Sequence, residues 1–489
     1  MPQLVVTVTG RTMDELRRRR DAAAGFADVV ELRLDSVDRP DVAGALEGRL
    51  RPVIVTCRPR WEGGEFEGSE LERQQLLMTA AHADAEFVDV ELRAEFAGDL
   101  LRARRGRGVV VSMHVFDAAE RDYAGGLAAL RATGAEVVKL AVQVDSLTQT
   151  LPLFELGQAA SRTADGQHHV FIAMGPRGMH TRVLSARLQN RWTYSGEGVA
   201  PGQMSPARML SEYHLRRLRG DAAIYGVTGS PVAHSLSPAM HNAGFTQTGL
   251  NAVYVPLDAR DAADFVAFAR AMDVRGASIT APFKVDMFRL VDERERLADE
   301  VGAINTLIVK NGRWIGANTD VAGFLAPLKG RITLRGTRAA VLGGGGAARA
   351  VAVALKREGA AVTICARKAG QAREVAKLAG VHASVFPPRP GTWDVLVNAT
   401  PCGARPDDPS PMAGVPLDGE IVFDLIYAPP ETPLIEQARE AGCLTIGGIE
   451  MLIAQAERQF EYWTGSTPPQ GLFTAAVSAA SEARAGVRS

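Results

Sequence analysis

The chain has 489 residues, which is too long for one ordinary hydrophobic core and predicts two to four domains. Its 55 basic and 56 acidic side chains nearly cancel, so no net field favours nucleic acid or an anionic membrane. We therefore expect small-molecule ligands, bound by local clusters of charge, and neither nucleic acid nor a membrane as a partner.

The cysteines lie far apart, with no CxxC pair and no spacing typical of zinc ligands, at Cys57, Cys365, Cys402 and Cys443. We therefore expect no metal and a reduced, cytoplasmic setting. The N-terminal sequence reaches charged residues before any signal-length apolar core. No later apolar run approaches the roughly 20 residues that span a bilayer, so we expect neither secretion nor membrane insertion.

Short apolar, β-rich runs recur eight times before residue 196. They begin at residues 4, 28, 52, 87, 109, 136, 168 and 191, with Arg- and Ala-rich helical stretches between them. Strands that alternate with helices in this way are typical of parallel βα units, and eight units predict a (β/α)8 TIM barrel. We assign the barrel to residues 1–219, and we expect its functional residues at the C-terminal ends of the strands.

The second half begins after a charged helical stretch that ends near Asp221. After Arg338 the sequence reads strand, glycine turn, helix and strand, which predicts a Rossmann nucleotide-binding unit. We assign residues 325–465 to that unit and residues 222–324 to a substrate-binding α/β domain. Helices from about 466–489 are expected to complete the substrate-binding domain, which leaves a cleft between two lobes.

Ionisable residues stand at the ends of the predicted barrel strands. A lysine among apolar neighbours, such as Lys139 in VVKLAV, is favoured as a neutral amine that can attack a ketone. His114, one strand earlier, could move a substrate proton. A carboxylate could be held by the guanidinium groups of Arg33, Arg58 and Arg182. The alternative is structural: an ion pair of Lys139 with Glu31 or Glu91, and a His114 that only packs.

These residues resemble the type I 3-dehydroquinate dehydratase family across residues 1–219. The matching positions are Glu31, Arg33, Arg58, Glu62, His114, Lys139, Met174, Arg182 and Gln203. The resemblance implies that Lys139 forms a Schiff base with the substrate ketone, without an external cofactor. It also implies that His114 takes a C2 proton and returns it to the departing hydroxyl.

The remaining matched residues are implied to bind substrate, with Glu31, Arg33, Arg58, Glu62, Arg182 and Gln203 in that role. The segment GEGVAPGQ is implied to close as a lid, because its glycines permit movement. Val199 stands where relatives often have serine, which puts one lid hydrogen bond in question. Three acids, Glu62, Asp89 and Glu91, are alternatives for orienting His114.

A glycine turn follows the first strand of the predicted Rossmann unit. Gly343, Gly345 and Ala348 satisfy GxGxxG/A between a strand and a helix, where a pyrophosphate can approach the backbone. The next strand ends at Arg367 and Lys368 without an acid for the ribose hydroxyls. This favours NADP over NAD, whereas the alternative is an exposed basic turn.

Four polar loops, SPVAHSLSP, SITAPFK, GAINT and GANTD, lie between residues 226 and 320. They suit a hydroxyl-rich substrate, and Lys284 beside Asp320 could supply the acid that a carbonyl reduction needs. From about residue 223 onward the chain resembles shikimate dehydrogenase. The resemblance implies that Ser235 and Ser237 hold the substrate carboxylate and that Lys284 and Asp320 are the catalytic pair.

The same resemblance implies further contacts. Other substrate ligands would be Thr280, Asn305, Tyr427 and Gln455. Cofactor ligands would be Gly343, Gly344, Gly345, Gly346, Ala347, Ala366, Arg367, Lys368, Asn398, Ala399, Thr400 and Gly448. Ser278 and Ala366 depart from the family pattern, and Gln371 stands where a second phosphate-binding cation is expected.

The two resemblances together imply a bifunctional enzyme of the shikimate pathway. The barrel would dehydrate 3-dehydroquinate, and the second half would reduce the resulting 3-dehydroshikimate to shikimate with NADPH, towards chorismate and the aromatic amino acids. The alternatives are a quinate dehydrogenase in the second half, working with NAD, and a regulatory relative that has lost turnover.

Overall fold

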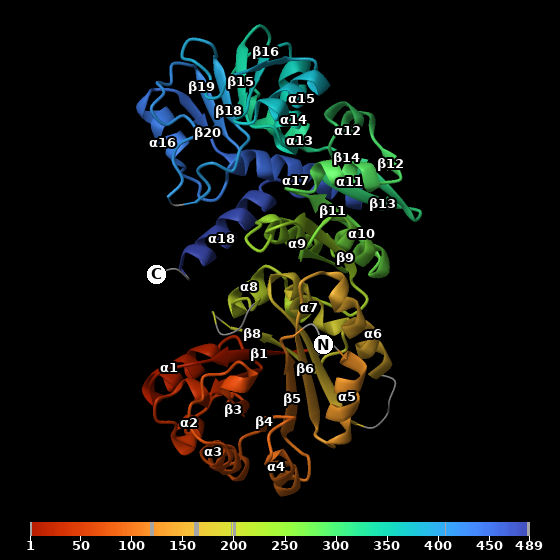
Figure 1. The fold of residues 1–489 in the computed structure, drawn as a ribbon, viewed down its shortest axis with the longest axis vertical. Helices are drawn as coiled ribbons and strands as arrows, with labels where there is room; N and C mark the ends of the chain where they lie inside the picture. The colour runs from red at the N-terminus through yellow and green to blue at the C-terminus, as the bar shows by residue number, and fades with distance from the viewer. Residues whose placement is uncertain are drawn as a thin grey trace.

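The computed structural model describes residues 2–117, 122–160, 166–196, 198, 202–405 and 407–486. The described part contains three sheets, one of eight strands and two of six. In Figure 1 the barrel, coloured red to yellow, lies at one end of the molecule and the later sheets lie at the other. Val199 of the expected lid falls outside the described residues.

The first sheet is the predicted parallel barrel. Its strand order is β7-β6-β5-β4-β3-β2-β1-β8. The strands are β1 (Gln3–Val8), β2 (Val29–Arg33), β3 (Val53–Thr56), β4 (Phe87–Glu91), β5 (Val109–Val115), β6 (Val137–Gln143), β7 (His168–Met174) and β8 (Trp192–Ser195). Each begins within one residue of its predicted start, because strands buried on both faces leave continuous apolar runs in the sequence.

The seam between β7 and β8 joins the two ends of this strand order. The Arg191 N–H donates to the His169 carbonyl at 3.0 Å. The Asn190 side chain accepts from the Phe171 N–H and donates to the Phe171 carbonyl, each at 2.9 Å. An amide side chain thus takes the place of a ladder rung, and the barrel is nearly closed.

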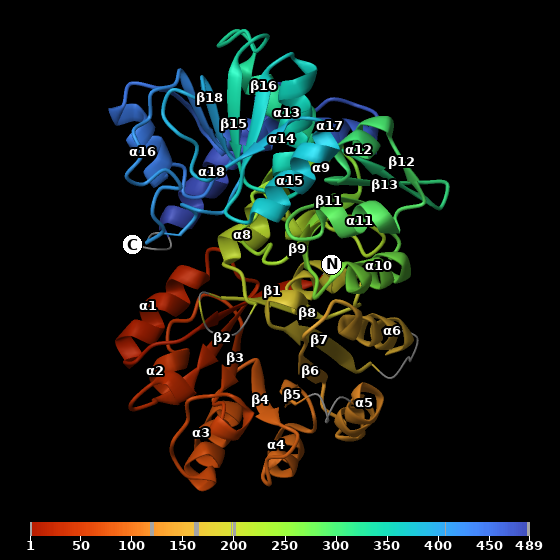
Figure 2. The same cartoon turned by 45° about the horizontal axis from the view of Figure 1, so that its top comes forward.

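Helices follow the strands around the barrel, as Figure 2 shows from a second direction. They are α1 (Met13–Ala23), α2 (Val42–Leu46), α3 (Glu70–His82), α4 (Ala97–Arg104), α5 (Tyr123–Ala132), α6 (Leu151–Ala160), α7 (His180–Val183) and α8 (Pro206–Ser211). Polar caps fix where several begin: Ser69 and Glu72 form a capping box at α3, and the Thr12 hydroxyl accepts from the Glu15 N–H at α1.

The second sheet is mixed, in the order β10-β9-β11-β13-β14-β12. Its strands are β9 (Ala223–Gly229), β10 (Ala252–Asp258), β11 (Val274–Ile279), β12 (Glu293–Arg294), β13 (Thr306–Lys310) and β14 (Arg313–Ala317). The helices in this part are α9 (Ser237–Gln247), α10 (Ala262–Ala271), α11 (Lys284–Leu290), α12 (Arg296–Val301) and α13 (Asp320–Leu325). The polar loops of the sequence connect these elements.

The third sheet is wholly parallel, in the order β17-β16-β15-β18-β19-β20. This is the 3-2-1-4-5-6 order of dinucleotide-binding folds, as expected from the glycine turn. Its strands are β15 (Arg338–Leu342), β16 (Ala361–Cys365), β17 (His382–Ser384), β18 (Val395–Asn398), β19 (Ile421–Asp424) and β20 (Leu444–Ile446). Its helices are α14 (Gly346–Arg357), α15 (Ala369–Ala379) and α16 (Pro433–Glu440).

The last two helices, α17 (Gly448–Thr464) and α18 (Leu472–Gly486), return to the second sheet. Phe460 of α17 and Phe473 of α18 share one buried core with Val227 of β9. The return to the substrate-binding part therefore begins at α17, whereas we expected it near residue 466. Among the described residues, no helix combines the length and the apolar character needed to span a bilayer.

The barrel contacts the second half through loops at the C-terminal ends of its strands. After β6, the backbone N–H groups of Leu147 and Thr148 donate to the Asp264 carboxylate of α10, at 2.9 and 3.0 Å. After β7, the Arg177 guanidinium lies 3.8 Å from Asp258 at the end of β10. The rim of the barrel mouth is thus part of the boundary between the two halves.

Candidate active sites

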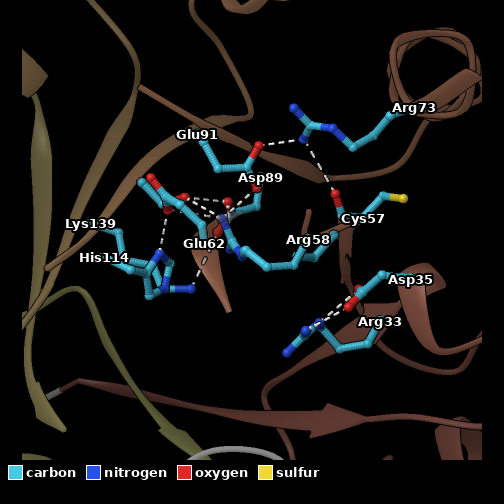
Figure 3. A network of polar contacts seen from close by, with 12 residues as sticks. Arg33, Asp35, Cys57, Arg58, Glu62, Arg73, Asp89, Glu91, His114 and Lys139 are labelled. Carbon is cyan, nitrogen blue, oxygen red and sulfur yellow. Dashed lines mark hydrogen bonds and ion pairs between the residues drawn. The ribbon is translucent and has the colours of Figure 1, made fainter. Parts of the chain in front are cut away.

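A buried cluster of charged side chains occupies the C-terminal end of the barrel (Figure 3). Its members come from consecutive strands and the loops after them: Glu31, Arg58, Glu62, Asp89, Glu91, His114 and Lys139. Because side chains alternate along a strand, Val137 and Ala141 share the interior face of β6 with Lys139, one before it and one after it, and both belong to a buried apolar core. The strand order therefore brings together residues that stand more than 100 positions apart.

The amine of Lys139 lies between two carboxylates. Its Nζ is 3.3 Å from Asp89 Oδ2 and 3.8 Å from Glu31 Oε1, and it lies 4.5 Å from the centre of the Tyr194 ring. This differs from our expectation of apolar surroundings, because only the strand neighbours of Lys139 are apolar. We had considered an ion pair of Lys139 with Glu31 or Glu91 as the alternative. Lys139 does pair with Glu31, and its second partner is Asp89 and not Glu91.

Arg58 and its acids set the charge of the cluster. Arg58 donates to Asp89 at 2.8 Å, to Glu91 at 2.6 Å and to the Ser112 hydroxyl at 2.7 Å. Burial alone raises the pKa of Asp89, but Arg58 and Lys139 outweigh it and hold that pKa below its ordinary range. Arg73 of α3, fully buried, donates to the other side of Glu91. The buried charges are thus paired with one another.

The three arginines proposed to hold a carboxylate differ in their surroundings. Arg33 makes a forked contact with Asp35 at 2.8 and 2.6 Å, and Arg58 faces the acids described above. Arg182 of α7 is buried and donates to the Ala173 carbonyl at 3.0 Å, and burial lowers its pKa to about 10. An anion beside Arg182 would offset that cost of burial.

His114 has one orienting partner among the three acids that the sequence left open. Its Nδ1 lies 2.7 Å from Glu62 Oε2. Burial lowers the pKa of His114 well below 6.5, which favours the neutral imidazole, and burial raises the pKa of Glu62 to about 7. With Nδ1 engaged by Glu62, Nε2 is the nitrogen left to exchange a proton with a ligand.

Gln203 is the last residue of the segment that we expected to act as a lid. Its Oε1 is buried and has no hydrogen-bond partner among the described residues. A Cβ added to Gly196 would lie 2.8 Å from that oxygen, so the glycine leaves room for the side chain. A buried acceptor of this kind is suited to a donor from a ligand.

The second site is built around Lys284 at the start of α11 and Asp320 at the start of α13. Lys284 Nζ lies 2.5 Å from Asp320 Oδ2. The Asn305 amide donates to Asp320 Oδ1 at 2.8 Å and to Gln455 Oε1 of α17 at 3.3 Å. Thr280 lies at the end of β11, where its N–H donates to the Thr228 carbonyl. Lys284, Asp320, Asn305 and Gln455 are thus linked by hydrogen bonds.

Ser235 and Ser237 lie on the turn that leads into α9. Both are buried, and the Ser237 N–H donates to the Ser235 hydroxyl at 3.2 Å. Burial raises the pKa of Tyr427, whose hydroxyl lies beside Ser235. Two hydroxyls and a phenol therefore lie at one place, as a carboxylate ligand would need.

The glycine turn lies against Lys284. A Cβ on Gly346 would lie 2.9 Å from Lys284 Cβ, and one on Gly344 would lie 2.7 Å from Gln371 Cβ. Gly343 has φ +124°, and a Cβ there would lie 2.9 Å from the Ala399 carbonyl. Gly345 faces open space at the N-terminus of α14, with Ala347 half-buried behind it. This cradle fits a pyrophosphate, which helix N–H groups would hold.

Other residues expected to contact the cofactor lie after β18, at the start of α17 and at the end of β16. Asn398 accepts from the Thr400 N–H and donates to Asp424, each at 3.0 Å, which shapes the loop after β18. Gly448 begins α17 where a Cβ would lie 2.3 Å from the Leu425 carbonyl. At the end of β16, Ala366 is buried, whereas Arg367 and Lys368 are exposed and take part in no ion pair within the described chain.

Some contributors were not expected from the sequence. Arg73 and Tyr194 border the barrel cluster, and Thr319 and Gln459 hold Asn305. The departure at Ser278 has a structural role, because its hydroxyl accepts from Tyr254 at 2.5 Å and donates to Gln459 at 2.7 Å. Arg73 lies one helical turn after Glu70, and a pair at this spacing is typical of an exposed helix surface, so the sequence did not indicate that Arg73 is buried.

Comparisons with known proteins agree with this division. Residues 4–219 match the model of the type I 3-dehydroquinase family. Residues 227–307 match the shikimate dehydrogenase substrate binding domain, and residues 448–477 match the shikimate 5'-dehydrogenase C-terminal domain. The first half is thus similar to a lyase and the second to an oxidoreductase.

Whole proteins and solved structures give the same result. The chain is 32% identical over 484 residues to a bifunctional 3-dehydroquinate dehydratase/shikimate dehydrogenase, chloroplastic, of Arabidopsis thaliana, covering 91% of this chain and 79% of the relative. It is 41% identical to a shikimate dehydrogenase (NADP(+)) of Methanocella arvoryzae, over 50% of this chain and 94% of the relative. A crystal structure of shikimate dehydrogenase from Aquifex aeolicus matches with a TM-score of 0.50 and 35% identity, over 53% of this chain and 99% of its own.

The fold and the two sites define a multifunctional enzyme with a lyase half and an oxidoreductase half. The chain belongs to the family of bifunctional 3-dehydroquinate dehydratase/shikimate dehydrogenase enzymes, which act in the shikimate pathway.

The contact between His114 and Glu62 predicts the pH dependence of the dehydratase. Ionised Glu62 holds the Nδ1–H, so activity should fall as pH drops through about 7, where Glu62 takes up a proton. Glu62→Gln should lower kcat about 10-fold or more and remove this decline, because His114 itself is protonated only well below pH 6.5.

The measurement is a pH profile of kcat and kcat/KM for 3-dehydroquinate. Glu65→Gln, an exposed neighbour, is the control and should keep the wild-type profile. A decline at the same pH in Glu62→Gln would assign it to another group and remove Glu62 from this role.

Proposed function

We propose that Lys139 and His114 dehydrate 3-dehydroquinate through a Schiff base. The Lys139 amine attacks the C3 ketone, and the ketone oxygen leaves as water to give an iminium. His114 then takes the C2 proton, the electron pair forms an enamine, and the C1 hydroxyl departs with the proton returned by His114. Water hydrolyses the iminium and frees 3-dehydroshikimate and Lys139.

The neighbours of Lys139 support this assignment. Asp89 and Glu31 lie within 4 Å of the amine. Glu31 would accept the proton of the amine as it attacks, whereas Asp89, whose pKa Arg58 and Lys139 hold low, stays ionised. Asp89 also steadies the positive iminium, since a buried cation needs a paired anion. The Glu62 contact leaves His114 Nε2 facing the substrate.

Substrate binding in the barrel is proposed for the residues around this centre. Arg182 would hold the carboxylate, since burial already lowers its pKa and an anion would restore a favourable charge balance. The orphaned Gln203 Oε1 would accept a substrate hydroxyl. The remaining proposed ligands, around the acids of the cluster, are Glu31, Arg33, Arg58 and Glu62.

The second half would reduce 3-dehydroshikimate to shikimate. Lys284 gives a proton to the carbonyl oxygen as it becomes a hydroxyl, and Asp320, 2.5 Å away, keeps the ammonium in place. Ser235, Ser237 and Tyr427 would hold the carboxylate. Asn305, Gln455 and Thr280 would hold the ring hydroxyls.

NADPH is the proposed cofactor, and it supplies the hydride to the substrate carbon when bound. The glycine cradle of Gly343, Gly344, Gly345 and Gly346, with Ala347, would hold its pyrophosphate. The exposed cations Arg367 and Lys368 would meet a 2′-phosphate, and Ala366, Asn398, Ala399, Thr400 and Gly448 would border the nucleotide. The relative from Methanocella arvoryzae is described as an NADP(+) enzyme.

The main support for the proposal is that each lysine forms an ion pair with a carboxylate: Lys139 with Asp89, and Lys284 with Asp320. Neither reaction as written needs a metal. A cytoplasmic setting is proposed from the cysteines, which are free thiols; the Arabidopsis thaliana relative is described as chloroplastic.

Borohydride reduction tests the Schiff base. Incubation with 3-dehydroquinate and sodium borohydride should reduce the iminium and leave a stable adduct on the peptide that contains Lys139, as mass spectrometry can locate. Lys139→Ala should lose both the adduct and dehydratase turnover while it keeps shikimate oxidation. Lys329→Ala, on a loop of the second half, should behave as wild type. An adduct at another lysine, or turnover retained in Lys139→Ala, would contradict the assignment.

Replacement of Lys284 tests the second site. Lys284→Ala should lower kcat for shikimate oxidation by about 10²- to 10⁴-fold, since it removes the group that exchanges the proton. NADP binding and dehydratase turnover should stay near wild type. In the wild type, oxidation should be faster with shikimate and NADP than with quinate and NAD. The reverse preference would favour the quinate alternative, and unchanged kcat in Lys284→Ala would remove its acid–base role.

A further inference from the structure

The loop that carries Ser235 and Ser237 is held from outside by two arginines. Three consecutive loop carbonyls accept their hydrogen bonds. Arg208 Nη2 donates to the Ala233 carbonyl at 3.1 Å. Arg484 donates from Nη1 to the His234 carbonyl at 2.6 Å and from Nη2 to the Ser235 carbonyl at 3.0 Å. The backbone position of this loop therefore depends on both guanidinium groups.

One buried carboxylate joins the two arginines. Glu212 Oε2 lies 2.8 Å from Arg208 Nε, and Glu212 Oε1 lies 3.2 Å from Arg484 Nη2. The Tyr213 hydroxyl accepts a further bond from Arg208 at 3.3 Å. Glu212 and Tyr213 are buried, so the geometry of the pair is fixed by groups that cannot exchange their partners for water.

The two arginines come from different halves of the chain. Arg484 lies on α18, whereas Arg208 lies on α8, inside the region matched by the type I 3-dehydroquinase model. In Figure 1, α8 lies between the barrel and the second half, facing α9 and α18. The match to the shikimate dehydrogenase of Aquifex aeolicus uses 53% of this chain and 99% of that enzyme. That enzyme therefore has no additional domain of the size of the barrel.

We infer that Arg208 is a positioning residue that the dehydratase half supplies to the dehydrogenase site. The inference rests on the proposed role of Ser235 and Ser237 in holding the shikimate carboxylate. The Ser235 hydroxyl accepts from the Ser237 N–H, so a shift of the loop carbonyls moves both hydroxyls together. A carboxylate remote from the reacting carbon is bound alike in the ground state and the transition state, so the affected quantity is KM.

Full-length Arg208→Met tests this role by steady-state shikimate oxidation at saturating NADP. KM for shikimate should rise about 10-fold, the effect of one lost charge-assisted hydrogen bond, with kcat within about twofold of wild type. KM for NADP should stay unchanged. Dehydratase turnover of the same sample shows that the chain is folded.

Asp264→Ala is the matched control. It removes another buried contact between the halves, the hydrogen bonds of Asp264 with Leu147 and Thr148. Among the hydrogen bonds of the described residues, none joins Asp264 to the loop that carries Ser235 and Ser237. It should leave KM for shikimate unchanged. If Asp264→Ala raised KM as much as Arg208→Met did, the effect would belong to the interface as a whole and the inference would be overturned.

Arg208→Lys provides a second variant in case Arg208→Met does not fold. It keeps a charge beside Glu212 but cannot also donate to Ala233 in the same geometry, so KM should rise by a smaller factor in the same direction. An unchanged KM in a folded Arg208 variant would overturn the inference. A wild-type chain that does not oxidise shikimate would instead contradict the proposed function.

Discussion

The ion pair of Lys139 with Asp89 is the contact on which the barrel site depends. A lone buried ammonium or carboxylate is strongly destabilising, so each charge in the mouth needs a partner of the opposite sign. Lys139 faces Asp89, Asp89 also faces Arg58, and Arg58 faces Glu91, whose other side is bound by Arg73. The chain of pairs holds the Lys139 amine in place among charges of the opposite sign.

The same residue type would serve a different chemistry in the second half because its surroundings differ. Lys139 lies inside the barrel among carboxylates, where we propose that it attacks a ketone. Lys284 stands at a helix start, against a glycine turn, with one carboxylate for a partner. The close approach of Gly346 to Lys284 places the proposed proton donor beside the proposed cofactor cradle, so the acid and the hydride source would meet at one carbonyl.

Much of the fold follows from the sequence because its signals are local. Eight apolar runs predicted eight strands, and the glycine turn between strand and helix predicted the strand order of the third sheet. The pairing of Lys284 with Asp320 was also expected. Local patterns could not show that α17 packs into the core of the second sheet, because an apolar helix face can pack equally well against the second sheet or the third.

The details that the sequence did not reveal are those set by tertiary packing. In the sequence Lys139 has apolar neighbours, whereas in the structure its amine lies between carboxylates from two other strands. Arg33 and Arg58 read as ligands for a carboxylate, yet acids of the protein lie against both. Arg208 reads as an ordinary helical cation, and only its contact with a loop 25 residues further along the chain distinguishes it.

On these proposals, the product formed at Lys139 is the substrate used at Lys284 of the same chain. The most direct measurement is NADPH oxidation by the purified chain after 3-dehydroquinate is added, for the wild type and for Lys139→Ala. The wild type should oxidise NADPH in proportion to the 3-dehydroquinate supplied. Lys139→Ala should oxidise none from 3-dehydroquinate but should still oxidise NADPH when 3-dehydroshikimate is supplied instead. NADPH oxidation from 3-dehydroquinate by Lys139→Ala, or none from 3-dehydroshikimate by the wild type, would contradict this coupling of the two sites.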